Sequence, residues 1–69
     1  MKTQTELDLE TGIKRQQHRI KRKLDDLREN NLSEFRVNQA CKDIVYYNKL
    51  KDELELTLST VQRAIKEAK

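Results

Sequence analysis

The fold is decided by residues 37–68, which read VNQACKD-IVYYNKL-KDELELT-LSTVQRA-IKEA when divided into sevens. The first and fourth residues of each seven, positions a and d of a heptad, are apolar or aromatic at nine of ten sites. A repeat sustained over more than four heptads predicts a long helix with a coiled-coil seam. Lys51 is the exception at an a position. The other seam positions are Val37, Ala40, Ile44, Tyr47, Leu54, Leu58, Val61, Ile65 and Ala68.

A second helical pattern, with fewer apolar residues, lies upstream. Ile13, Ile20 and Leu27 recur every seven residues, and in the same heptad frame they occupy d positions. Leu24 and Gln17 then fall at a, so this frame predicts a thin seam of isoleucine and leucine. The neighbouring basic residues fall at the other heptad positions, which predicts that they lie outside the seam.

Local signals place the ends of the two helices. Residues 3–6, Thr-Gln-Thr-Glu, form a capping-box pattern that predicts a helix start near residue 4. Gly12 costs about 1 kcal/mol inside a helix and marks an expected weak point. Residues 30–33, Asn-Asn-Leu-Ser, combine a helix-ending residue type with an N-cap serine. We therefore predict a single domain with helices over 4–29 and 34–68, joined by a turn over 30–33.

So short a connection predicts an all-α, antiparallel αα-hairpin of coiled-coil type. In this hairpin, residue i of the first helix should face about residue 63 − i, which places Gly12 opposite residue 51. Val61 and Ile65 would then extend beyond the first helix. A second hairpin could cover them, so we predict a homodimer that forms a four-helix bundle.

Composition excludes several other classes. Proline is absent, and Gly12 is the single glycine, a composition typical of helical chains. One Cys and one His cannot supply the four ligands of a structural zinc site, and Cys41 has no partner for an intrachain disulfide. No glycine-rich phosphate loop or nucleophile–base spacing is present, so we expect no enzyme and no cofactor. Without an apolar run or an apolar leader, the expected location is the cytoplasm, with no membrane span.

Residues 14–23, KRQQHRIKRK, hold six cations and the only histidine, and they contain no acid. On a helix these side chains stack at i, i+4 in two adjacent rows, an arrangement that opposes helix formation by about 0.2–0.5 kcal/mol per pair. Such rows could bind the phosphate backbone of a nucleic acid. Three acids, Glu10, Asp25 and Asp26, lie four residues from a cation and could neutralise part of the charge. The candidate anion-binding residues are Lys14, Arg15, His18, Arg19, Lys21, Arg22 and Lys23.

The same basic residues could instead form a solvent-exposed charged surface. They could also form ion pairs with acids of a neighbouring chain, such as Asp52, Glu53 and Glu55. An acidic protein partner is a further alternative. An anionic membrane surface is disfavoured, because a membrane-binding helix needs a large apolar face.

A second candidate surface lies on the outer side of the second helix, where Phe35, Val45, Tyr46 and Leu56 fall outside the seam. Phenylalanine and tyrosine often anchor protein interfaces. The sequence thus predicts a non-enzymatic binding or regulatory module that contacts nucleic acid through residues 14–23. The alternative is an adaptor, inhibitor or scaffold whose protein partner docks on the second helix.

Overall fold

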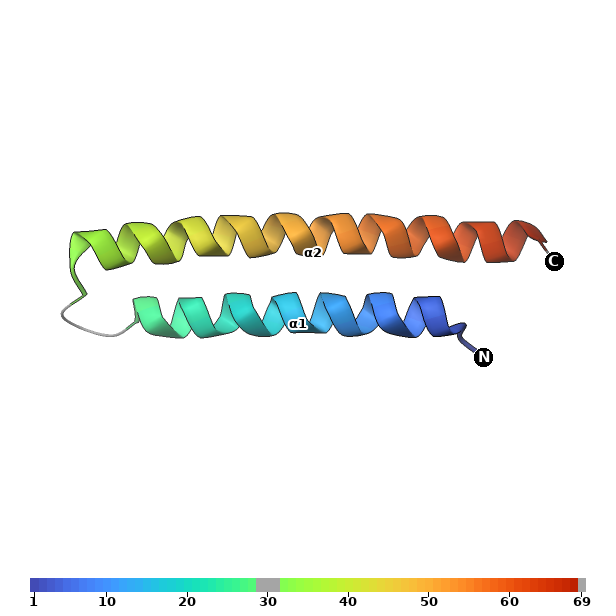
Figure 1. The fold of residues 1–69 in the computed structure, drawn as a ribbon, viewed down its shortest axis with the longest axis horizontal. Helices are drawn as coiled ribbons and strands as arrows, with labels where there is room; N and C mark the ends of the chain where they lie inside the picture. The colour runs from blue at the N-terminus through green and yellow to red at the C-terminus, as the bar shows by residue number, and fades with distance from the viewer. Residues whose placement is uncertain (29–31, 69) are drawn as a thin grey trace.

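The computed structural model describes residues 1–28 and 32–68 of the 69-residue chain as two antiparallel helices, α1 and α2. Helix α1 spans Gln4–Leu27 and α2 spans Glu34–Ala68. They lie side by side in a rod of 56 × 17 × 12 Å, with both termini at one end (Figure 1). The all-α hairpin predicted from the heptads is confirmed.

Three of the four helix ends agree with the predicted bounds. Thr3 is the N-cap of α1, and the Ser33 hydroxyl accepts a hydrogen bond from the Arg36 amide at 3.2 Å near the start of α2. Helix α1 ends at Leu27 with Arg28 as its C-cap, so the predicted end at residue 29 is too late. The predicted turn over 30–33 lies partly outside the described residues.

The two helices are offset from the predicted register. Gly12 faces Leu54 rather than residue 51, and Glu6 hydrogen-bonds Gln62, so α1 reaches further along α2 than the sequence suggested. Helix α2 begins beyond the end of α1 (Figure 1), so each facing pair lies about three residues nearer the carboxyl end of α2 than predicted. Val61 and Ile65 are accordingly half-buried, and the expectation that α1 leaves them uncovered is wrong. Helix α2 extends past α1 at both ends (Figure 1).

The inward side of α1 differs from the predicted seam. Ile13, Ile20 and Leu27 face α2 as expected, whereas Gln17 is exposed and Leu24 is 44% exposed. The other seam positions are taken by residues one place earlier: Gln16, which is buried, and Lys23, which is half-buried. Gly12 lies four residues before Gln16, on this same side. The helix is therefore turned toward its glycine and away from Leu24.

Helix α1 continues through Gly12, and the missing side chain there allows a close approach of the two helices. A Cβ built at this position would lie 3.2 Å from Leu54 Cδ1, which is tighter than an ordinary carbon–carbon contact. The side chain of Leu54 thus packs almost directly on the backbone of α1.

Replacing Gly12 by alanine is expected to raise the free energy of unfolding by up to about 1 kcal/mol, the helix-propensity gain of alanine over glycine. The contacting atom is the end of a half-buried leucine, which can move by the few tenths of an ångström required. Leucine at the same position would displace Leu54 and is expected to destabilise the hairpin. Urea unfolding followed by circular dichroism measures both variants. A destabilising alanine would show that Leu54 cannot move.

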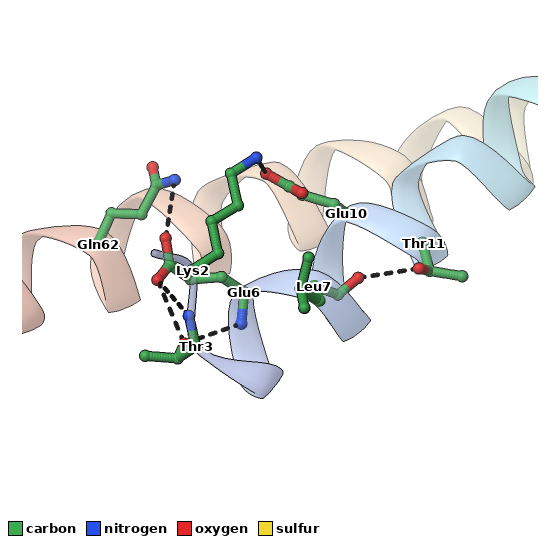
Figure 2. Close-up of polar contacts among 7 residues, drawn as sticks. All are labelled: Lys2, Thr3, Glu6, Leu7, Glu10, Thr11 and Gln62. Atoms are coloured by element: carbon green, nitrogen blue, oxygen red, sulfur yellow. Dashed lines mark hydrogen bonds and ion pairs between the residues drawn. The ribbon is translucent and has the colours of Figure 1, made fainter.

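The amino terminus of α1 is fixed by a network of polar contacts (Figure 2). Glu6 Oε1 accepts hydrogen bonds from the Thr3 amide at 3.1 Å and the Thr3 hydroxyl at 3.2 Å, and the Glu6 amide donates back to that hydroxyl. Gln62 Nε2 of α2 donates to Glu6 Oε2 at 3.3 Å. Lys2 pairs with Glu10, and this hydrogen bond raises the pKa of the Lys2 ammonium. The predicted capping box is confirmed, and it also ties α1 to α2.

Acid is expected to weaken this end of the hairpin through Glu6. The hydrogen bond from the Thr3 backbone, helped by those from Gln62 and the Thr3 hydroxyl, lowers the pKa of the Glu6 carboxyl from its ordinary 4.5, although burial opposes the shift. A lowered pKa means that the stabilisation is fully present above pH 4.5 and is lost as the pH falls through the folded-state value.

Glu6→Gln keeps an oxygen acceptor in the capping box but removes the charge. We expect this variant to melt below the wild type at neutral pH. The gap in melting temperature should close as the pH is lowered below 4.5. A gap that stays constant across the titration would show that the charge of Glu6 contributes nothing.

Candidate functional site

Five of the basic-stretch residues lie on the side of α1 that points away from α2. Each is exposed, and the helical spacing places them on one outward surface, which we call the basic face. Its members are Lys14, Arg15, His18, Lys21 and Arg22.

The cations of the basic face form no ion pairs with the nearby acids, two of which pair with other residues. Within the described residues, no carboxylate lies within ion-pair distance of its four cations. Glu10 pairs with Lys2, and Asp25 with Arg28 at 3.5 Å. The pairings of Glu10 with Lys14, of Asp25 with Lys21 and of Asp26 with Arg22 that the sequence offered are not formed.

The other two cations of the stretch contact α2 instead. Lys23 Nζ lies 3.2 Å from Asp43 Oδ2 between the helices, and both side chains are about one-third exposed, at 33% and 28%. The prediction that the basic residues of 14–23 lie outside the seam is therefore wrong for Lys23. Arg19 places its guanidinium carbon 5.6 Å from the centre of the Tyr47 ring, a cation–π contact. Both side chains therefore contact α2, although Arg19 is exposed on the flank of α1.

Within the basic face the four cations form two rows. Lys14 and Lys21 are seven residues apart, as are Arg15 and Arg22, so each row spans about 10 Å of helix. His18 lies between the rows, three or four residues from each cation. This arrangement places positive charge on both sides of His18, where it can attract an extended anion.

The second candidate surface is exposed but divided. Phe35 is 77% exposed, Val45 69%, Tyr46 60% and Leu56 70%. Phe35 and Tyr46 are eleven residues apart, as are Val45 and Leu56, which separates each pair by about 16 Å along α2. The Tyr46 ring packs edge-on against Tyr47 at 5.7 Å. These side chains are separate apolar points rather than one continuous patch.

The α2 seam residues face α1 without forming a closed core. Val37, Ile44, Tyr47, Leu54, Leu58, Val61 and Ile65 are all half-buried, and Ala40 is buried at 8% exposure. Lys51 is also half-buried and lies 3.9 Å from Glu55 of its own helix. In the described part of the chain, no side chain is less than 2% exposed.

A cleft of about 330 Å³ opens at the turn end of the hairpin, where α2 begins beyond the end of α1. Phe35, Leu32 and Ala40 supply its apolar lining, and the Lys23–Asp43 pair lies at its edge. Sequence reasoning missed this cleft, because it depends on the offset between the helices. The one available signal was Phe35, an aromatic residue close to the break.

Two further features are absent from residues 1–28 and 32–68. No group of three or more His, Cys, Asp or Glu side chains there could hold a metal ion. Neither described helix is long and apolar enough to cross a membrane.

No family model matches the chain, and no curated protein or solved structure shows significant similarity to it.

Proposed function

We propose that the protein is a non-enzymatic helical module whose basic face binds the phosphate backbone of nucleic acid. The observation that supports this proposal is the set of four exposed cations with no carboxylate of the described residues at ion-pair distance. Binding would release the counterions condensed on the phosphates, and that release supplies the free energy. A cytoplasmic location, as the sequence predicts, agrees with such a partner.

Salt titration tests this function. For four phosphate contacts, the logarithm of the association constant should fall with the logarithm of salt concentration with a slope of about −3.6. Affinity for a labelled DNA duplex, measured by fluorescence anisotropy, should then drop roughly 150-fold between about 50 and about 200 mM salt. Binding that is absent at the lowest salt, or that does not change with salt, would overturn the proposal.

A second candidate function is supported by the exposed apolar side chains of α2. Phe35 is 77% exposed and lines the turn-end cleft, so a protein partner could dock there. In this case Phe35→Ala should abolish capture of a protein from nuclease-treated lysate while helix content is kept. Capture that disappears on nuclease treatment alone would favour the basic face instead.

We further propose that two hairpins associate into a four-helix bundle. Ala40 is the one apolar residue of the described chain that is buried, and so small a core rarely stabilises a domain by more than about 3–5 kcal/mol. The helices of a second copy would pack against the half-buried seam residues of α2 and cover the part of them that is still exposed. Sedimentation at micromolar concentration should show twice the 8.2 kDa chain mass, and the melting temperature should rise with protein concentration. A folded species of single-chain mass would contradict this proposal.

A further inference from the structure

The two rows of the basic face point to different sides of the outward surface. Neighbouring residues on an α-helix are about 100° apart around its axis, since 3.6 residues complete a turn. The row of Lys14 and Lys21 is therefore separated from the row of Arg15 and Arg22 by about a quarter turn. His18 lies on the line between them. The two rows therefore flank His18 on opposite sides.

A helix with cations on two sides can be placed between the two strands that border a groove of duplex DNA. An α-helix with its side chains is about 10–12 Å in diameter, and the major groove of B-form DNA is about 12 Å wide. Resting on the proposed function, we infer that the basic face lies in the major groove of double-stranded DNA. Lys14 and Lys21 contact one phosphate strand and Arg15 and Arg22 the other, while α2 remains outside the groove.

Single-stranded nucleic acid lacks the groove that this arrangement requires. Proteins that bind single strands stack the bases on aromatic side chains, and α1 contains no Phe, Tyr or Trp. The Tyr47 ring on α2 already contacts Arg19. Double-stranded RNA is disfavoured as well, because the major groove of an A-form helix is too narrow and deep to be entered.

Recognition is expected to depend little on base sequence. The residues that would face the base edges fall between the two rows, at Thr11, His18 and Asp25. The Thr11 hydroxyl donates to the Leu7 carbonyl oxygen at 2.9 Å (Figure 2), and Asp25 pairs with Arg28. His18 is left as the one base-facing side chain of this line, without the arginine, asparagine or glutamine pairs that usually read bases.

Binding to four labelled ligands of equal length tests the inference: two DNA duplexes of unrelated sequence, one of their single strands, and an RNA duplex. We expect the two DNA duplexes to bind within about threefold of each other, and the other two ligands at least about tenfold more weakly. Equal or tighter binding of the single strand or the RNA duplex would overturn the groove assignment and leave backbone binding standing. Salt-sensitive binding to none of the four would overturn the proposed function itself.

Separate removal of each row tests whether both strands are contacted. The double variants Lys14→Gln/Lys21→Gln and Arg15→Gln/Arg22→Gln should each make the salt slope on duplex DNA shallower by about 1.8. Lys42→Gln/Lys49→Gln is the matched control, because both lysines are exposed on α2 with the same seven-residue spacing. If one row carries the whole salt dependence, or if the control changes the slope as much as either row, the inference is wrong.

Discussion

Replacing Gln16 by leucine is expected to stabilise the hairpin by about 2 kcal/mol. Gln16 is 8% exposed, and its side-chain oxygen Oε1 is buried with no hydrogen-bond partner in the described residues. An unsatisfied buried polar atom costs about 1–3 kcal/mol, and a buried leucine gains about 1.5–3 kcal/mol over an exposed one. Imperfect packing of the new side chain reduces the sum, because Gln16 and leucine differ in shape.

Gln17→Leu is the matched control, because the substitution is the same and the site is one residue away. Gln17 is exposed, so the free energy of unfolding of this variant should differ from that of the wild type by no more than about 0.5 kcal/mol. Urea unfolding at one protein concentration, followed by circular dichroism, compares both variants with the wild type. A gain at Gln17 with none at Gln16 would show that α1 presents the side predicted from the sequence and not the side found in the structure.

The sequence could not decide between these two sides of α1. Ile13, Ile20 and Leu27 belong to both, and simple hydrophobicity favours the frame that adds Leu24. The structure adopts the frame with Lys23, which forms an ion pair with Asp43 across the hairpin. Contacts of this kind depend on the register between helices, which a periodic pattern within one helix does not contain.

The helix ends depend on residues close together in the sequence, and they were predicted more accurately than the register between the helices. The heptads of α2 and the serine before it gave the bounds 34–68, and the capping box gave the start of α1. The end of α1 lacked a glycine or proline to mark it, and the prediction there was two residues too long. The error in register, and with it the expectation that α1 leaves Val61 uncovered, has a different origin: α2 begins beyond the end of α1, and no pattern within either helix contains that offset.

The candidate site also combines features that the sequence predicts with features that only the packing of the two helices reveals. The cations of residues 14–23 were visible in the sequence, whereas the two that contact α2 were identified only in the structure. Arg15 and Arg19 both lack an acid four residues away, yet Arg19 lies over the Tyr47 ring while Arg15 belongs to the basic face. The surface assigned to an anion therefore has four cations rather than the six that the sequence suggested.

Removing all four cations of the basic face is expected to have the largest effect on binding. Glutamine at Lys14, Arg15, Lys21 and Arg22 should weaken the affinity for duplex DNA at least about 100-fold at about 50 mM salt and abolish most of its salt dependence. Helix content should be kept, because glutamine is nearly as good a helix former as lysine or arginine. Repulsion between like charges four residues apart also falls, so the variant should melt no lower than the wild type.

A control with the same net charge separates a defined site from general attraction. Glutamine at the exposed α2 cations Lys42, Lys49, Arg63 and Lys66 also removes four positive charges, so both variants change the net charge from +3 to −1. Binding through the basic face predicts that the α2 variant keeps most of its affinity. Equal losses in the two variants would show that net charge alone attracts the DNA. Undiminished binding of the basic-face variant would place the contact elsewhere, since its four cations would then contribute nothing to affinity.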